Sequence, residues 1–256
     1  MLEVALVLAL LIGVLLGMLG GGGSVLLVPV LLYVLMLEPK VALATSQMVM
    51  AATTAVAVLL HVRAGRVVFS TGVIFGVSGM LGSYLGGRIA HFIPSVVLLS
   101  GFIGLMVVSA VQMLRAKRPS TTSADGGANA AAPGTRPKPW LGAVVGFPTG
   151  LTAGMLGAGG GFLVVPALTL FGGLSIQQAV GTSLLVIAMQ SFAGSMGYLG
   201  HAAVNFRLVG MLALAMGASS VLGGVLSQKV PALTLRKLFA GLLLAVAALM
   251  LLKTFI

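Results

Sequence analysis

Residues 17–24 read Gly-Met-Leu-Gly-Gly-Gly-Gly-Ser, and residues 154–161 read Gly-Met-Leu-Gly-Ala-Gly-Gly-Gly. Each stretch interrupts a long apolar segment, the first covering residues 4–37 and the second residues 140–171. A glycine inside a helix costs about 1 kcal/mol relative to alanine, so such glycine clusters disfavour a continuous helix. Both apolar segments are therefore predicted to be broken helices.

The rest of the composition places these breaks in a membrane protein. Of the 256 residues, 59% are hydrophobic and 7% are charged, against about 25% charged residues in an ordinary soluble domain. A chain of this size folded in water could bury only part of that apolar surface in one core, and the rest would be exposed to solvent. The net charge is +11, but the basic residues lie between apolar runs and do not gather on one soluble face, so no nucleic-acid partner is expected. The absence of cysteine excludes disulfides and thiolate chemistry.

Six further apolar runs are long enough to cross a bilayer as helices. They cover residues 41–60, 67–90, 95–114, 178–199, 207–227 and 233–252. Residues 115–139 are rich in Ser, Thr, Ala, Gly and Pro and have basic ends, which is typical of a flexible linker. The prediction is an all-α integral membrane protein with a first membrane repeat at 1–114, a basic cytoplasmic linker at 115–139 and a second repeat at 140–256.

The two halves are related by a constant offset of 137 positions. At this offset the glycine stretches coincide, Pro29 falls on Pro166, Thr45–Ser46 on Thr182–Ser183, and Gly86–Gly87 on Gly223–Gly224. A collinear series of this kind indicates an internal duplication. Each half is expected to contain a glycine-broken helical hairpin or re-entrant segment followed by three transmembrane helices.

The orientation of the repeats depends on how often each broken segment crosses the membrane. The arms at 2–16 and 24–37 would be roughly 22 Å long as helices, short of a hydrocarbon core of about 30 Å. A hairpin gives each half an odd number of crossings, and the repeats are then inverted. The inverted count places ten basic residues on the side of the linker (positions 63, 66, 115, 117, 118, 136, 138, 229, 236 and 237) and four on the other (40, 88, 207 and 253). The positive-inside rule therefore favours inversion with a cytoplasmic linker, while a parallel arrangement, split nine to five, stays the alternative.

Paired helix breaks are a sequence signature of transporter binding sites, because the freed backbone groups must line a cavity or pair with a ligand. We expect a helix to restart at Ser24 and another at Gly161, each directing N–H groups and a partial positive charge toward a bound anion. The predicted backbone donors are Gly20, Gly21, Gly22, Gly23, Ser24, Gly157, Gly159, Gly160 and Gly161.

Polar side chains follow each break. Thr45, Ser46, Thr182 and Ser183 are expected either to donate to an oxyanion or to hydrogen-bond the preceding helical turn. Deeper in the same two helices lie Gln47, Thr53, Thr54, Gln190 and Ser191. Of these, Gln47 and Gln190 are predicted to contact substrate, with interhelical packing as the alternative.

Residues suited to catalysis are few. Glu3, Glu38 and Asp125 lie at termini or in loops, and no metal-ligand spacing or catalytic triad is present, so neither an enzyme, a metal nor a cofactor is expected. His61 and His201 follow equivalent helices. They are interpreted as interfacial residues or, alternatively, as groups for gating or proton relay.

The paired segments Gly17–Pro29 and Gly154–Pro166, each followed by a Thr–Ser helix start, resemble the TauE/SafE sulfite exporter family. The resemblance covers about residues 5–252 and implies a duplicated three-helix module in a bacterial or archaeal inner membrane. It also implies a carrier of small anions, chiefly sulfur oxyanions and organosulfonates such as sulfite, thiosulfate or sulfoacetate. Ser24 and Ala44 stand where the second half has Gly161 and Gly181, so the two half-sites are not equivalent.

The function expected from these observations is secondary transport of such an anion by alternating access, with the anion held at the glycine breaks near the midplane. An anion channel with a static glycine-loop filter is the alternative. The expected partners are the anion and the lipid bilayer, and a homo-oligomer is left open.

Overall fold

The computed structural model describes residues 2–115, 139–157, 159–170, 172–226 and 232–255. These residues form helices and short connections, with no strand among them. The predicted linker lies outside the described residues except at its ends, where residue 115 closes one helix and residue 139 opens the next.

The first half begins with a broken helical segment. Helix α1 (Leu2–Leu19) leads into the 3₁₀-helix η1 (Gly20–Leu26), which continues as the short helix α2 (Leu27–Tyr33). Helices α3 (Pro39–Arg63), α4 (Phe69–Ala90) and α5 (Ser95–Arg115) follow. Proline at the start of α3 has no N–H to leave unpaired there, and its fixed φ suits the first helical turn.

The second half has the same order of long and short helices. They are α6 (Pro139–Leu156), α7 (Gly161–Leu170), α8 (Ile176–Tyr198), α9 (Phe206–Leu226) and α10 (Ala232–Phe255). Helix α8 begins with a capping box, in which the Ser175 hydroxyl accepts from the backbone N–H of Gln178. The six predicted apolar runs lie in α3, α4, α5, α8, α9 and α10, and both predicted breaks are present.

Within the described residues, six segments are long and apolar enough to cross a membrane. They are Leu2–Tyr33, Pro39–Arg63, Phe69–Ala90, Ser95–Gln112, Gln177–Tyr198 and Phe206–Leu226. Large apolar side chains also face outward, such as Leu81, which is 62% exposed, and Leu214, which is 76% exposed. Lipid is the solvent that such a surface requires, and the chain is a multi-pass membrane protein.

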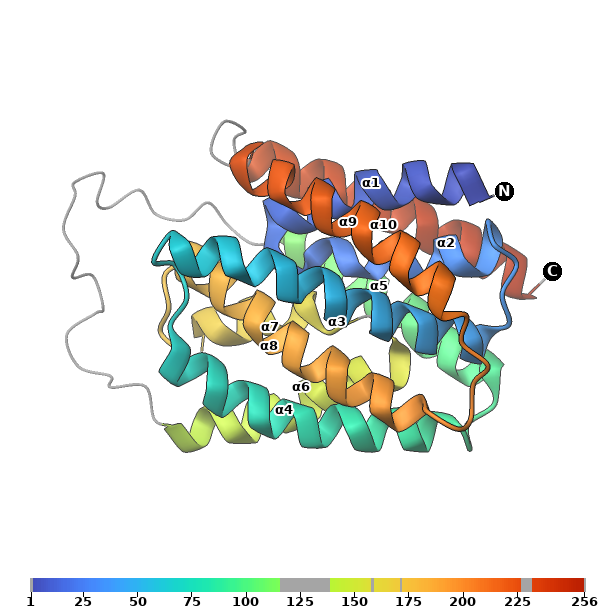
Figure 1. Cartoon of the computed structure of the whole chain (residues 1–256), viewed down its shortest axis with the longest axis horizontal. Coiled ribbons are helices and arrows are strands. Elements are labelled where there is room, and N and C mark those ends of the chain that lie inside the picture. The colour runs from blue at the N-terminus through green and yellow to red at the C-terminus, as the bar shows by residue number, and fades with distance from the viewer. Residues whose placement is uncertain (1, 116–138, 158, 171, 227–231, 256) are drawn as a thin grey trace.

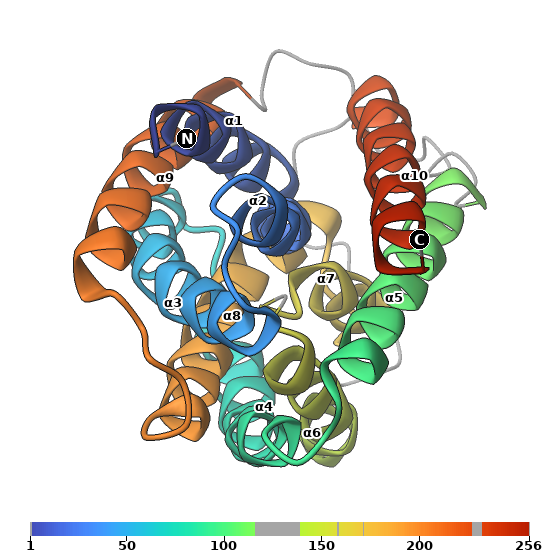
Figure 2. The ribbon, with the colours of Figure 1, turned by 90° about the vertical axis from the view of Figure 1, so that its right-hand side faces the viewer.

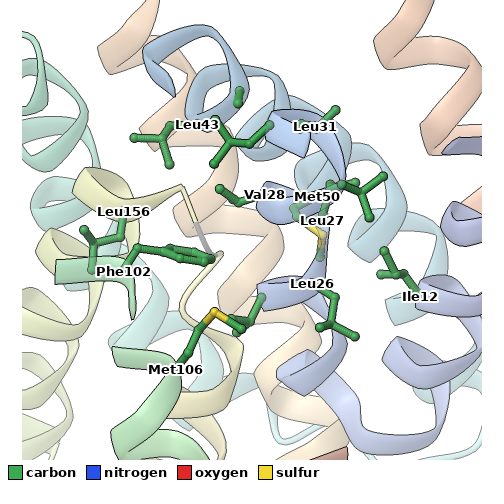
Figure 3. Packing of buried hydrophobic residues seen from close by; sticks show 14 of the residues in the cluster. Ile12, Leu26, Leu27, Val28, Leu31, Leu43, Met50, Phe102, Met106 and Leu156 are labelled. Atoms are coloured by element: carbon green, nitrogen blue, oxygen red, sulfur yellow. The ribbon is translucent and has the colours of Figure 1, made fainter. Parts of the chain in front are cut away.

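The short helices lie inside the molecule. The helices run along the long axis of Figure 1, and the view along that axis in Figure 2 shows α2 and α7 inside a wall that includes α4, α5, α6, α9 and α10. Every residue of η1 is buried, as are six of the seven residues of α2. Figure 3 shows Leu27 and Leu31 packed among side chains that include Leu43 and Met50 of α3 and Phe102 of α5.

Glycines bring the two halves into close contact. A methyl group built on Gly17 of α1 would collide with the carbonyl oxygen of Ser220 in α9, and one built on Gly154 of α6 would collide with that of Ser83 in α4. The same offset of 137 that relates Gly17 to Gly154 relates Ser83 to Ser220. The broken helix of each half therefore packs against the middle transmembrane helix of the other half.

Candidate functional site

The two glycine breaks meet in the interior. Gly20 and Gly157 have φ of 69° and 66°, a left-handed conformation that ends the long helix in each half and that glycine adopts without penalty. A methyl group built on Gly21 would collide with the Cα atom of Gly161, and one built on Gly161 would collide with that of Gly21. The tertiary fold thus joins two segments that are 140 residues apart in the sequence.

The two breaks differ in their backbone. In the first, residues 20–26 form η1 and an α-helix starts only at Leu27, so the predicted restart at Ser24 is wrong. A 3₁₀-helix pairs its own N–H and C=O groups three residues apart, and the predicted amide donors of this break are partly used within it. The Ser24 hydroxyl donates to the carbonyl of Gly21 at 2.7 Å.

The second break opens directly onto an α-helix. Helix α7 starts at Gly161 as predicted, and the N–H groups of Leu163 and Val164 both donate to the carbonyl of Gly160 at 3.0 Å. Its two preceding N–H groups have no acceptor within the helix, as at any helix N-terminus. Gly159 and Gly160 also have positive φ, at 65° and 66°. The second break therefore presents N–H groups that its own helix does not use, whereas the first break continues from α1 into η1 without a residue between them.

Each half places a serine on the break of the other half. The Ser46 hydroxyl lies 2.5 Å from the carbonyl oxygen of Gly157 and 2.8 Å from that of Leu43. Ser183 donates to the carbonyl of Val180 at 2.8 Å, and a methyl group on Gly20 would lie 3.3 Å from its hydroxyl oxygen. Both serines therefore bond back to the preceding turn, the alternative considered from the sequence, and also line a break.

The threonines beside these serines are not equivalent. The Thr182 hydroxyl accepts from the backbone N–H of Val68 at 3.0 Å, which attaches α8 to the connection before α4. The hydroxyl of Thr45 is buried and has no partner. Of the pair, only Thr45 keeps a hydroxyl that no protein group uses.

The two glutamines lie in the interior with different bonding. Gln47 donates through Nε2 to the carbonyl of Ala153 at 2.6 Å, which ties α3 to the last turn of α6. Gln190 is fully buried, and neither atom of its side-chain amide has a partner. A methyl group on Gly160 would lie 3.1 Å from its Oε1 atom. Gln190 therefore lies against the second break.

Unpartnered polar atoms are concentrated in α3, α4 and α8. Among the described residues, the buried side-chain atoms without a hydrogen bond are Thr45 Oγ1, Gln47 Oε1, Thr53 Oγ1, Ser83 Oγ, Gln190 Nε2 and Oε1, and Ser191 Oγ. Each such group costs about 1–3 kcal/mol when nothing satisfies it. The sequence pattern did not single out Ser83, because one serine among the small residues of α4 carries no local signal of function.

The two singled-out histidines lie apart. His61, in the last turn of α3, is buried, with Nδ1 3.1 Å from the carbonyl oxygen of Ala57. His201 is exposed beyond the end of α8 and stacks on His91, with ring centroids 4.4 Å apart. Lys40, at the start of α3, donates to the carbonyl of His91 at 2.6 Å. His61 and His201 therefore lie near opposite ends of α3, about 30 Å apart along the helix axis.

Charged groups are sparse around the breaks. Glu3 and Glu38 are exposed at helix ends, and Asp125 lies outside the described residues. No three His, Cys, Asp or Glu side chains come close enough to hold a metal ion in the part of the chain that the structure describes. What this interior offers a ligand is uncharged hydrogen-bonding groups and helix-end dipoles.

Comparison with known proteins agrees with this architecture. The family model described as "Sulfite exporter TauE/SafE" matches residues 5–250. A "probable membrane transporter protein" of Xylella fastidiosa is 31% identical over 246 residues, which are 93% of this chain and 90% of that protein. The probable membrane transporter protein YdhB of Bacillus subtilis is 26% identical over 240 residues, covering 91% of this chain and 96% of its own.

An archaeal relative, a probable membrane transporter protein of Methanocaldococcus jannaschii, is 23% identical over 260 residues, covering 95% of this chain and 92% of its own. No solved structure matches the chain. The family match extends from α1, in the first broken helix, to residue 250, two residues before the end of the last predicted transmembrane run. The chain therefore belongs to the TauE/SafE sulfite exporter family of membrane transporters.

Proposed function

We propose that this protein is a secondary transporter of small anions, with sulfur oxyanions and organosulfonates such as sulfite, thiosulfate and sulfoacetate as its substrates. The anion binds where the two glycine breaks meet and crosses the membrane by alternating access. The protein acts as a transporter without catalysing a chemical change.

The meeting of the breaks is the observation that carries this proposal. Gly21 and Gly161 touch in the buried interior, and Ser46 and Ser183 each reach the break of the other half. A helix interrupted at membrane depth is tolerated where its freed backbone groups are satisfied by other groups or line a cavity. A site formed jointly by both halves can change its exposure when one half rocks against the other.

The chemistry of the breaks suits an anion. Helix N-termini carry a partial positive charge and free N–H groups, and hydroxyl and amide side chains supply further donors. Sulfur oxyanions and sulfonates present several acceptor oxygens on a compact group. A buried arginine or lysine is not needed, which agrees with the position of the described basic residues near helix ends.

An inverted arrangement of the two halves is part of the proposal. It is supported by Figure 1, where α1 starts at the end of the molecule that carries the N and C marks and α6 starts at the opposite end. Contacts of His91 with His201 and of Lys253 with Tyr33 link helix ends from the two halves, and Lys40 donates to the carbonyl of His91 at the same place. With ten basic residues assigned to the linker side, the positive-inside rule favours a cytoplasmic linker, and the resemblance to the family implies the inner membrane.

The test is transport by the purified full-length protein in proteoliposomes. The labelled anions are sulfite, thiosulfate and sulfoacetate, with acetate as a carboxylate control. We expect saturable uptake of at least one sulfur anion, accelerated when the same unlabelled anion is trapped inside the vesicles. Such acceleration is expected of a carrier whose binding site returns to the outside with an anion bound, and it is not expected of a channel.

Two results would contradict the proposal in different ways. Flux that rises without saturation and carries a single-channel conductance would identify an anion channel. Failure to transport any of the sulfur anions, with correctly folded protein, would remove them as substrates.

A further inference from the structure

The polar groups around the second break differ in their hydrogen bonding from the corresponding groups around the first. Positions of the two halves correspond at an offset of 137, so Gln190 and Ser191 of α8 correspond to Thr53 and Thr54 of α3. The Thr54 hydroxyl donates to the carbonyl of Met50 at 2.6 Å, whereas Ser191 and Gln190 have no partner. Thr53 is also unpartnered, and it is the exception among these positions around the first break.

The same contrast holds one helix away. Ser83 of α4 corresponds to Ser220 of α9, and both are buried. Ser220 donates to the carbonyl of Gly217 at 2.8 Å, while the Ser83 hydroxyl has no partner. The position that corresponds to Gln47 is Leu184, an apolar residue. The polar groups around the first break are therefore mostly hydrogen-bonded or replaced by apolar residues. Those around the second break are polar and mostly lack a partner.

The unsatisfied groups of α8 lie next to the second break, and that of Ser83 lies one turn further along α8. A methyl group on Gly160 would lie 3.1 Å from Gln190 Oε1, and one on Gly159 would lie 3.4 Å from Ser191 Oγ. Gly194, one turn further along α8, faces Ser83, whose hydroxyl oxygen would lie 2.6 Å from a methyl group there. Helix α8 thus lines Gly159 and Gly160 with hydroxyl and amide groups, and α4 adds the Ser83 hydroxyl one turn further along α8.

The backbone shows the same one-sidedness. Helix α7 starts at Gly161 after the left-handed residues Gly159 and Gly160 and leaves its first N–H groups without an acceptor in the helix, whereas η1 follows α1 with no residue between them. Buried donors without a partner destabilise a protein, and no bulk water reaches the hydrocarbon layer to satisfy them. A set of them gathered at one helix N-terminus indicates that a ligand is the missing partner.

We propose that the transported anion binds on one side of the repeat axis, at the second break. Its oxygens accept from the N-terminal N–H groups of α7, from the Gln190 amide and from the hydroxyls of Ser191 and Ser83. Gln47 already donates to Ala153 through Nε2, and its unpartnered atom is the acceptor Oε1, so it is not counted among these donors. The first break packs against this site through Gly21 and does not itself bind the anion. This inference rests on the proposed function.

The repeat supplies matched controls for the test. The variants are Ser83→Ala with its counterpart Ser220→Ala, and Ser191→Ala with its counterpart Thr54→Val, all in the full-length protein. Binding of labelled thiosulfate, sulfite and sulfoacetate is measured for each, together with the thermal unfolding midpoint without ligand. The wild-type protein first defines which anion binds.

We expect Ser83→Ala and Ser191→Ala to weaken binding of that anion about tenfold or more, the usual loss for a hydrogen bond to a charged group. The same two changes should raise the unfolding midpoint of the ligand-free protein, because each removes an unsatisfied buried hydroxyl. Ser220→Ala and Thr54→Val should leave binding within about twofold and should not raise the midpoint. A purely structural serine would not give opposite effects on stability and binding.

The outcomes separate this inference from the function it deepens. If the wild-type protein binds an anion and both members of each pair weaken binding alike, the site is shared by the two halves and the one-sided assignment is wrong. Unchanged binding in both Ser83→Ala and Ser191→Ala would also overturn it. If the wild-type protein binds none of the three anions, the proposed function fails and this assignment fails with it.

Discussion

Gly20 and Gly157 have the same backbone conformation at corresponding places in the two halves, and the space around them is already filled. A methyl group on Gly157 would lie 2.8 Å from the Cα atom of Leu43 and 2.9 Å from Ser46 Oγ. These distances are shorter than the normal contact between a Cβ atom and a non-bonded heavy atom. An L-residue with a side chain also pays about 1–2 kcal/mol for left-handed φ. At this position, both the backbone conformation and the packing require glycine.

Gly157→Ala is therefore expected to lower stability by about 2 kcal/mol or more, since the backbone penalty and the overlap add. Transport should fall with it, because Ser46 and the second break would be pushed apart. The measurements are the thermal unfolding midpoint in detergent and anion uptake in proteoliposomes.

Gly104→Ala is the control for this change. Gly104 lies in α5, where a methyl group would meet nothing within 4 Å, and alanine favours a helix over glycine by about 1 kcal/mol. It should be neutral or slightly stabilising. Equal losses in the two variants would mean that the effect at Gly157 reflects general intolerance of glycine replacement.

At the scale of elements, helix α1 packs closely on α9, and α4 on α6, because glycines at the contact points have no side chain. Gly17 and Gly154 each face a serine carbonyl oxygen of the helix packed against them, and the two contacts correspond at the repeat offset. Small residues allow such close helix approach in membranes, where packing and polar contacts drive association. Equivalent crossings in both halves should thus respond alike to the same substitution.

We expect Gly17→Ala and Gly154→Ala each to destabilise the protein by about 1–3 kcal/mol, the usual cost of an overpacked contact. Gly210→Ala in α9, where nothing lies within 4 Å of the added methyl group, should have no such cost. Thermal unfolding midpoints of the three variants provide the comparison. A large loss in only one of the first two would show that the crossings are not equivalent.

On the scale of the whole molecule, the orientation of the halves can be tested directly because the chain has no cysteine. Ala64 and Ala203 are exposed residues in equivalent connections, α3–α4 and α8–α9. In an inverted protein these connections lie on opposite sides of the membrane, and in a parallel one on the same side.

With single-cysteine variants Ala64→Cys and Ala203→Cys in intact cells, we expect a membrane-impermeant thiol reagent to label only Ala203→Cys. Ala64→Cys should react only after the membrane is permeabilised, because Arg63 and Arg66 flank it and the positive-inside rule favours the cytoplasmic side for such a connection. Labelling of both variants from the same side would refute inversion.

Local features of the sequence predicted most of the helices. The transmembrane runs and both breaks follow from apolar length and from glycine clusters, which are properties of neighbouring residues. The restart at Ser24 was wrong because residues 20–26 wind as a 3₁₀-helix packed against Leu16 and Gly161, and local propensity does not distinguish this from an early α-helix.

The candidate site was predicted less completely. Gln190 was singled out because a buried amide in a membrane needs a partner, whereas Ser83 had no local feature to distinguish it. The pairing of His201 with His91 was also missed, since the two residues are brought together by the ends of α4 and α8.

The sequence by itself determined that this is a duplicated helical membrane protein with one glycine break in each half. Apolar run length and backbone propensity are local properties that do not depend on long-range contacts. Only the tertiary structure decided that the breaks touch, that Ser46 and Ser183 serve opposite halves, and that unsatisfied polar groups gather around the second break. These contacts join residues 30 or more positions apart, most of them more than 100, so they depend on how whole helices pack and leave no trace in the spacing of neighbouring residues.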